Sequence, residues 1–210
     1  MIDCPHFPKT DSNVYERKGD LHSMKRSTFE HLPENLPVPI DDHAADHIKG
    51  MSLPSIALIS SKGGKVDLGT LGRTYVIYCY PMTGRPNVPL PEGWDEIPGA
   101  RGCTPQSLSF RARYSEIRNL NADVFGLSTQ DTTYQAEMAE RLHLPFRILS
   151  DEHFQFCRSL RLPTFEVEGQ TLVKRLTMIV HKTQIVSVHY PVFPSTSDPD
   201  WVIKELTKQG

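Results

Sequence analysis

Blocks of hydrophobic residues separated by polar turns run from about residue 53 to residue 206 of this 210-residue chain. The block TYVIYCY at 74–80 is continuous, β-branched and aromatic, which is typical of a strand buried on both faces. Gly63 and Gly64 provide the backbone freedom for a hairpin turn between two further strands. The predicted strands cover 53–60, 65–68, 74–80, 122–129, 146–149, 172–180 and 184–190.

Helices are predicted between the later strands, each after a capping signal. The first covers 105–119, with Thr104 as its N-cap and Pro105 at the first helical position. Asp131 and Asp151 can cap the second and third, and the pair Asp198-Pro199 starts the fourth. Alternation of strands and helices requires parallel neighbours, and the late hairpin adds antiparallel edges. The pattern predicts an α/β fold with a mixed central sheet and helices on both faces.

The first 50 residues differ from the rest of the chain. They hold five of the 17 prolines, many charges and no sustained apolar period. We expect about the first 30 residues to form a weakly ordered extension and 32–51 to lie along the domain surface. The predicted organisation is an N-terminal extension over 1–50 and one folded domain over 51–210.

Composition and charge exclude several classes of protein. Lys and Arg number 23 against 25 Asp and Glu, and a net charge of −2 gives no broad surface for nucleic acid or an anionic membrane. No apolar run approaches the ~20 residues of a membrane-spanning helix, and the first residues lack the pattern of a secretory signal. With only 4 cysteines, the chain is expected in the reducing cytoplasm.

The segment 81–102 breaks the pattern of strands and helices. It carries five prolines and four glycines, and a loop this long without its own structure is usually functional or disordered. It leads from the carboxyl end of a buried strand to a helix, where ligands bind in open α/β sheets. Cys103 stands at its end, beside helix N–H groups that favour the reactive thiolate. Cys103 is therefore the candidate nucleophile, and a small buried residue at a turn is the alternative.

The other cysteines are weaker candidates. Cys79 lies within a predicted strand and Cys157 on the apolar face of a predicted helix, so both are expected in the core. Cys4 lies in the predicted extension. No pair has the CxxC spacing of a zinc knuckle or a redox pair.

The nine histidines do not define a metal site. His43 and His47 are four residues apart and close to Asp42 and Asp46, but no third ligand follows from the core. The motifs GxGxxG, GxSxG and HExxH are absent. We therefore expect neither a metal nor a cofactor.

Five segments resemble, in order, the successive blocks of the peroxiredoxin family: YCYP, GCTPQSLSFR, LNADVFGLSTQD, LPFRILSD and KRLTMIV. The match extends from about Leu53 to Leu206. It is nearest to the Q-type branch (bacterioferritin comigratory protein-like), which has a Gly-Cys-Thr entry to the catalytic helix. The resemblance implies a thioredoxin-like fold, in agreement with the element order predicted above.

The resemblance also implies roles for individual residues. Cys103 corresponds to the peroxidatic cysteine, and Arg175 to the strand arginine that faces its sulfur. A guanidinium there can stabilise a thiolate and bond a peroxide oxygen. Gln106 corresponds to the Glu or Gln with an orienting role in the first turn of the catalytic helix.

Two features depart from the family pattern. The usual Pro-x-x-x-Thr-x-x-Cys motif is interrupted, because Cys103 follows Pro81 by 22 residues and Ala100 stands where the threonine would be. Thr83 is the candidate for the missing hydroxyl, and Thr104 is the second choice.

The second departure is Leu108, which occupies the position five residues after Cys103 where Q-type members often carry a resolving cysteine. A disulfide within this helix therefore cannot form. Either Cys157 or Cys79 resolves the intermediate after local unfolding, or an external thiol does so. We favour the external thiol.

The resemblance implies a cofactor-free antioxidant oxidoreductase, a thiol peroxidase that reduces hydrogen peroxide or organic hydroperoxides through a Cys103 sulfenic acid. Its expected partners are the hydroperoxide and a reductant such as thioredoxin, glutaredoxin or a small thiol, and a homodimer is left open. One alternative is a peroxide sensor or thiol-redox binding protein on the same fold, without efficient turnover. Others are a structural role and a Cys–His hydrolase, whose candidate bases are His143, His181 and His189.

Overall fold

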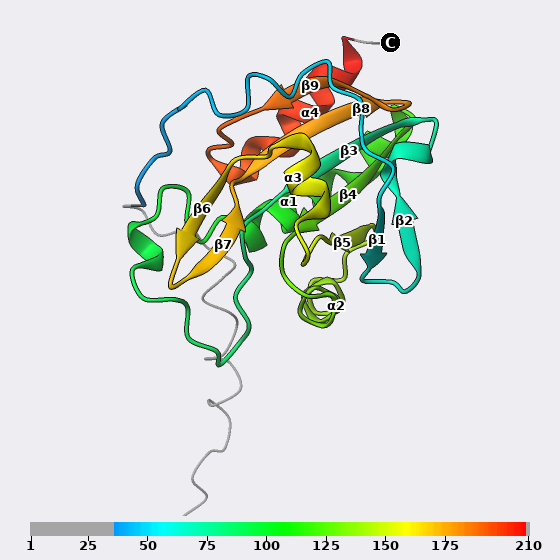
Figure 1. Ribbon diagram of the computed structural model, residues 1–210. Coiled ribbons are helices and arrows are strands. Elements are labelled where there is room, and N and C mark those ends of the chain that lie inside the picture. The colour runs from blue at the N-terminus through cyan, green and yellow to red at the C-terminus, as the bar shows by residue number, and fades with distance from the viewer. Residues whose placement is uncertain (1–35, 209–210) are drawn as a thin grey trace, which may run out of the picture.

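The computed structural model describes residues 36–208, and its central sheet has seven strands in the order β2-β1-β5-β4-β3-β8-β9 (Figure 1). The strands are β1 (Ala57–Ser60), β2 (Lys65–Asp67), β3 (Thr74–Cys79), β4 (Ala122–Ser128), β5 (Arg147–Ser150), β8 (Leu176–His181) and β9 (Gln184–His189). β3, β4 and β5 are parallel, and the outer pairings are antiparallel. This confirms the predicted mixed sheet.

The continuous apolar block of β3 is explained by its place in the middle of the sheet, where alternate side chains enter two different cores. One core contains Tyr75, Ile77 and Cys79, and the other contains Tyr78 and Tyr80. The second core is covered by α1 (Cys103–Asn119), α2 (Thr132–Arg141) and α4 (Asp198–Thr207). The first is covered by α3 (Gln155–Leu160). Helices therefore lie on both faces, as predicted.

The predicted strand at 53–60 is shorter in the structure. β1 starts at Ala57, because Pro54 lacks the N–H that a paired strand requires. Leu53 instead donates its N–H to the Thr183 carbonyl at 2.7 Å, at the turn between β8 and β9. The segment before β1 is thus fastened to the opposite edge of the sheet.

The predicted extension lies mostly outside the described residues, and its described part, 36–51, runs along the surface beside β9 (Figure 1). Ile48 is fully buried in the core on the α3 side. Asp42 accepts hydrogen bonds from Lys174 at 2.6 Å and from Tyr190 at 2.7 Å, and these donors hold the pKa of its carboxyl well below the usual range. These contacts fasten the segment to the domain. The boundary near residue 50 stays a prediction.

The first helix begins two residues earlier than predicted, at Cys103, and Thr104 is not its cap. The Gly102 carbonyl already accepts from the Gln106 N–H at 2.9 Å, so the helical hydrogen bonds start at Gly102. Pro105 then takes the third helical position, where a missing N–H costs nothing. The shift places Cys103 inside the first turn of α1.

Asp131 and Asp151 bond the first N–H groups of α2 and α3, as predicted. The Asp131 carboxylate accepts from the Tyr134 N–H at 2.8 Å at the start of α2. α3 begins later than predicted, after Phe154 in a left-handed conformation, but the Asp151 carboxylate still accepts from the Cys157 N–H at 2.8 Å. The 10-residue α4 begins at Asp198, as expected.

The predicted strand at 172–180 is wrong as a single element. It divides into β7 (Gln170–Val173), which pairs with β6 (Thr164–Val167) in a separate two-stranded sheet, and β8. The break falls at Lys174 and Arg175, whose side chains turn to partners distant in sequence, Asp42 and Gln106 respectively. The β6–β7 hairpin was not predicted.

The long loop after β3 lies beside this hairpin (Figure 1). The loop contains a short 3₁₀ helix at Trp94–Glu96. Trp94 is buried and packs against Phe165 of β6, with ring centroids 6.4 Å apart. A small third core, to which Ala100 and Leu172 also belong, therefore orders the loop that precedes Cys103.

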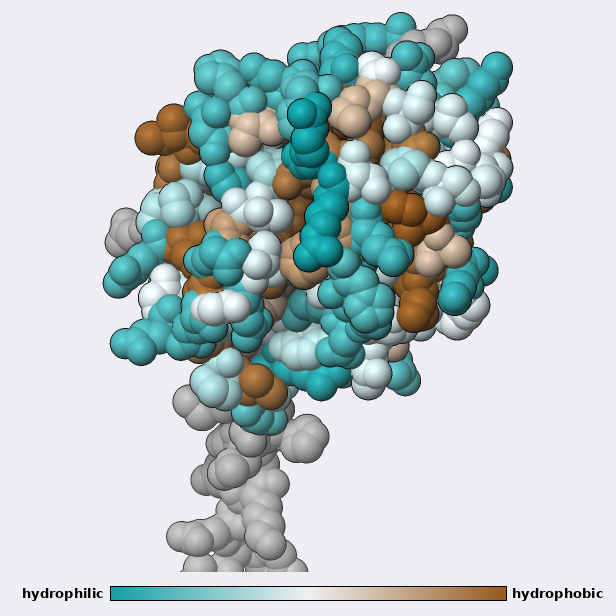
Figure 2. All heavy atoms as spheres, in the orientation of Figure 1, coloured by the Kyte–Doolittle hydropathy of each residue, from teal (hydrophilic) through white to brown (hydrophobic). Residues whose placement is uncertain are grey.

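The surface seen in Figure 2 intersperses hydrophobic residues with hydrophilic ones. None of the helices between residues 36 and 208 is long and apolar enough to cross a lipid bilayer.

Candidate active site

Cys103 lies at the start of α1, where the loop of Trp94 meets the helix. Its sulfur accepts a hydrogen bond from the Arg175 guanidinium, with 3.2 Å between Nη2 and Sγ. Both side chains are buried, with 2% and 8% of their surface exposed. A buried cation beside a thiol at a helix N-terminus is an arrangement typical of reactive cysteines. The structure therefore brings together the two residues that the family resemblance had paired.

Arg175 is fixed in this orientation by two further acceptors. Its Nη2 also donates to the Gly99 carbonyl at 3.2 Å, and its Nη1 donates to Gln106 Oε1. Gln106 lies one turn after Cys103 and is fully buried. The predicted orienting residue thus contacts the arginine, not the sulfur.

Behind Gln106 lies a polar group that was not predicted from the sequence. Gln106 Nε2 donates to the Asp198 carboxylate at 2.7 Å, and Thr177 of β8 donates to the same oxygen at 2.6 Å. His189 Nδ1 lies 2.8 Å from the other oxygen. From the sequence, Asp198 was predicted only as the start of α4. The Asp-Pro signal for a helix start gives no indication of its contacts with Gln106, Thr177 and His189.

The site is closely packed around Gly102, which explains why a glycine occupies this position. A Cβ at this position would lie 2.8 Å from Ser195 Oγ and 3.0 Å from Arg175 Nη2. Its φ of −77° is accessible to any residue, so close approach and not backbone freedom accounts for the glycine. The Ser195 hydroxyl is buried beside the site without a hydrogen-bond partner among residues 36–208.

Thr83 lies in a small pocket that Cys103 and Thr104 also line. Its hydroxyl donates to Gln130 Oε1 at 3.3 Å, and its backbone N–H donates to the same oxygen at 3.0 Å. Both candidate threonines are therefore close to the thiol. The role of Thr83 as the hydroxyl partner of Cys103 stays a prediction.

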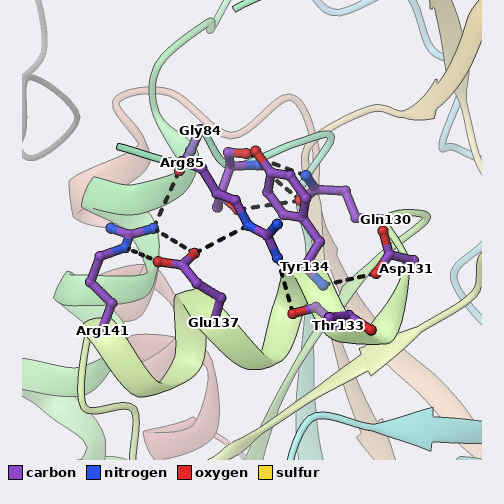
Figure 3. Close-up of polar contacts among 9 residues, drawn as sticks. Gly84, Arg85, Gln130, Asp131, Thr133, Tyr134, Glu137 and Arg141 are labelled. Atoms are coloured by element: carbon purple, nitrogen blue, oxygen red, sulfur yellow. Dashed lines mark hydrogen bonds and ion pairs between the residues drawn. The ribbon is translucent and has the colours of Figure 1, made fainter. Parts of the chain in front are cut away.

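The segment after Thr83 is held on α2 by a group of charged residues (Figure 3). Arg141 donates to the Gly84 carbonyl at 3.2 Å and to Glu137 at 2.6 Å. Arg85 lies over the Tyr134 ring, 4.1 Å from its centroid, and donates to the Thr133 carbonyl at 3.2 Å. These contacts fix the beginning of the long loop, as the third core fixes its end.

An apolar cavity of about 420 Å³ opens on the other side of Arg175. Its walls include Ile97 and Trp94 of the loop, Phe165 of β6, and Val192. Arg175 and Lys174 are the charged side chains of the lining, and Lys174 is paired with Asp42. Cys103 itself lines the smaller pocket, so the cavity adjoins the site through Arg175 and Trp94.

Cys79 and Cys157 are buried in the core on the opposite face of the sheet from Cys103. Burial raises the pKa of both thiols above the ordinary value, and among residues 36–208 neither has a cationic neighbour like Arg175. Leu108 is partly buried against the core that contains Cys103. A disulfide from Cys103 to Cys157 would therefore require local unfolding.

The histidines considered for a metal site have other contacts. His43 lies 3.1 Å from Asp46 on the surface, and His47 Nε2 lies 3.1 Å from the Leu160 carbonyl oxygen. In the described part of the chain, no three His, Cys, Asp or Glu side chains are grouped to hold a metal ion.

Comparison with known proteins places this site in a family. The redoxin family profile matches residues 48–203. The rice protein named peroxiredoxin Q, chloroplastic (Oryza sativa subsp. japonica) is 32% identical over 143 residues, which cover 68% of this chain and 58% of that protein. The chain thus spans just under three fifths of that relative. The peroxiredoxin Q of Sedum lineare is 30% identical over 175 residues, which cover 82% of this chain and 85% of the relative.

Solved structures agree on the fold. The crystal structure of peroxidoxin BcpB from Mycobacterium tuberculosis superposes with a TM-score of 0.63 at 21% identity, over 76% of this chain and 96% of that one. This likeness confirms the thioredoxin-like architecture that the family resemblance implied. By its profile match and its relatives, the chain belongs to the redoxin family and, within it, to the peroxiredoxin Q group.

Proposed function

We propose that the protein is a thiol-dependent peroxidase in which Cys103 reduces hydrogen peroxide or an organic hydroperoxide. The observation that carries the proposal is the 3.2 Å contact between Arg175 Nη2 and Cys103 Sγ at the start of a helix. Membership of the peroxiredoxin Q group supports a peroxidase in general terms. The residues named here, the substrate and the reductant are our inference.

The proposed first step is a displacement at oxygen. The Cys103 thiolate attacks the terminal oxygen of the hydroperoxide, so that a sulfur–oxygen bond forms as the oxygen–oxygen bond breaks. The electron pair leaves with the second oxygen, which takes a proton and departs as water or an alcohol. Cys103 is thereby oxidised to a sulfenic acid. The Arg175 guanidinium stabilises the thiolate and the charge that develops on the peroxide.

The proposed second step uses an external thiol. One thiol condenses with the sulfenic acid, releasing water and leaving a mixed disulfide, and a second thiol displaces the Cys103 thiolate. Leu108 and the burial of Cys157 on the opposite face support an external reductant such as thioredoxin, glutaredoxin or a small thiol. A cytoplasmic location and a homodimer are part of the proposal; cell fractionation and sedimentation would test them.

The apolar cavity beside Arg175 supports organic hydroperoxides as substrates. Its volume of about 420 Å³ lies within the range of small-molecule sites, and the apolar walls would bury a hydrocarbon group. Cumene hydroperoxide should therefore give a higher kcat/KM than hydrogen peroxide. An Ile97→Ser variant should reduce this preference and leave the hydrogen peroxide rate unchanged.

The decisive experiment compares peroxide consumption by the wild type and by Cys103→Ser. With thioredoxin or dithiothreitol as reductant, the wild type should turn over repeatedly and Cys103→Ser should be inactive, while Cys79→Ala and Cys157→Ala remain active. Mass spectrometry after one equivalent of peroxide should find one added oxygen on Cys103. Retained activity in Cys103→Ser would overturn the proposal. A wild type that is oxidised once and then stalls would favour the sensor instead.

A further inference from the structure

We propose that Asp198 and His189 are positioning residues that hold Arg175 against Cys103 through the Gln106 amide. Four hydrogen-bonded contacts connect them in series: His189 to Asp198, Asp198 to Gln106, Gln106 to Arg175, and Arg175 to Cys103. We refer to these five residues as the relay. The inference rests on the proposed function, because it assigns residues that support the proposed nucleophile Cys103. One of its two readouts, the thiolate absorbance, does not depend on peroxidase activity.

The orientation of the Gln106 amide is the central point. An ionised carboxylate only accepts hydrogen bonds, so Asp198 requires the Nε2 donor of Gln106 on its side. A guanidinium only donates, so Arg175 requires the Oε1 acceptor. Both demands are met by one orientation of the amide. Removal of the carboxylate would free the amide to turn over, and its NH₂ group would then face the arginine.

Asp198 is suited to hold this orientation because it is itself firmly held. Its side chain is fully buried at the start of α4, where the helix dipole favours a negative charge. Thr177 donates to Oδ2 and His189 meets Oδ1, so both oxygens have partners besides Gln106. A buried carboxylate with several donors is a rigid reference point for the groups around it.

His189 forms the outer end of the relay. Its side chain is 20% exposed, and its ring stacks on Trp201 of α4 with centroids 4.6 Å apart. The stacking and the contact to Asp198 fix the ring in one position. His189 thus shields the buried carboxylate from solvent and supplies its last hydrogen bond.

The test exchanges the carboxylate and the amide between positions 198 and 106. Asp198→Ala should remove the acceptor that holds the Gln106 amide and free it to turn over, and Gln106→Glu should place two carboxylates together. The double variant Asp198→Asn/Gln106→Glu again gives Arg175 an acceptor oxygen, because the new Asn NH₂ can donate to the new Glu carboxylate. Asp200→Asn, at an exposed position on α4 paired with Arg113 at 3.1 Å, is the matched control.

Two quantities are measured for each variant: the thiolate absorbance of Cys103 between pH 4 and 9, and the second-order rate constant with hydrogen peroxide. Each single variant should lower the rate at least tenfold and reduce the thiolate present at neutral pH. The double variant should recover both to within about threefold of wild type. Thermal unfolding checks that each variant is folded, and if Asp198→Ala is not, Gln106→Leu should reproduce the loss of thiolate.

A purely structural role predicts that the variants lose stability and keep the wild-type thiolate fraction, and that result would overturn the inference. Failure of the double variant to recover would do the same. If the wild type consumes no peroxide, the proposed function fails, but the thiolate measurements still decide whether the relay positions Arg175.

Discussion

Two thiol environments on the two faces of one sheet differ in their charged neighbours and not in their burial. Cys79, Cys103 and Cys157 are all at most 2% exposed. Cys103 faces Arg175 at 3.2 Å, whereas Cys79 and Cys157 lie in an apolar core where desolvation raises their pKa. A buried thiol is therefore inert by default, and a built cationic site is what makes one of the three a candidate nucleophile.

The same comparison bears on how an oxidised Cys103 would be reduced in the proposed reaction. The sheet separates Cys103 from the other two described thiols, because adjacent residues of β3 point to opposite faces. Exchange within the folded domain would require that α3 leave the core. An external thiol needs only access to the Cys103 pocket, which supports the reductant proposed above.

The sharpest way to break the comparison is to remove the cation. We expect Arg175→Leu to lower the rate constant with peroxide by roughly 10²- to 10³-fold, about 3–4 kcal/mol of transition-state stabilisation. The thiolate absorbance at neutral pH should fall with it, because the buried sulfur loses its charged donor. Stopped-flow peroxide consumption and absorbance titration measure the two effects.

Lys174→Leu is the matched control, since Lys174 adjoins Arg175 but pairs with Asp42. It should leave both quantities unchanged. An Arg175→Leu variant with wild-type thiolate and rate would mean that the helix start alone activates Cys103.

The opposite test places a polar group on the inert face. Cys157→Ser puts a hydroxyl in a largely apolar core where the Asp151 carboxylate can accept its hydrogen bond, and we expect it to lower the free energy of unfolding by roughly 1 kcal/mol. The peroxide rate should stay within about twofold of wild type. Urea unfolding and a peroxidase assay on the same sample measure both, and a large loss of rate in a folded Cys157→Ser would show that Cys157 takes part in turnover.

A smaller effect is expected at Gly102. Gly102→Ala would bring a methyl group to about 3 Å from Arg175 Nη2 and Ser195 Oγ, so the guanidinium must shift from the sulfur. We expect the peroxide rate to fall about tenfold, or about 1.4 kcal/mol. In Gly102→Ala/Ser195→Gly the contact with Ser195 is relieved, and a deficit that persists there belongs to Arg175. An unchanged rate in the single variant would contradict the close packing argued here.

The fold could be predicted wherever local pattern and packing agree. The apolar block of β3 reads as a central strand because both of its faces are buried. The β6–β7 hairpin escaped prediction because Leu172 and Val173 were assigned to the strand that follows, and its contacts are with the distant loop of Trp94. The break before β8 depends on long-range partners of Lys174 and Arg175, which no local pattern reveals.

In the candidate site, the residues with a local or family signal could be predicted, and those that depend on long-range contacts could not. Cys103 was predicted from its place between the long loop and a helix, Arg175 from the family resemblance, and the structure brings them together. Asp198 and His189 were not connected to Cys103, because the Asp-Pro pair reads as a helix start and an isolated histidine in a strand carries no signal of its partner. Contacts that join α1, β8, β9 and α4 exist only once the chain has folded.

The last and smallest effect concerns alkaline pH and the inert face. The pKa of Cys79 is raised in the folded state, so the folded protein keeps the proton that the unfolded chain loses above its ordinary pKa of ~8.5. Stability from this group is complete below that value and declines as pH rises. Near pH 9.2 the expected loss is about 1 kcal/mol per buried thiol. The buried tyrosines Tyr75 and Tyr78 enter only above about pH 10, where their ordinary pKa lies.

Urea unfolding at about pH 7.5 and about pH 9.2 measures this loss. Cys79→Ala should reduce the difference between the two pH values by about 1 kcal/mol. Val66→Ala, at a buried position in the same core, should lower stability equally at both. If Cys79→Ala left the pH difference of the wild type intact, the Cys79 thiol would already ionise in the folded protein. Burial without a cation would then no longer distinguish the two faces of the sheet.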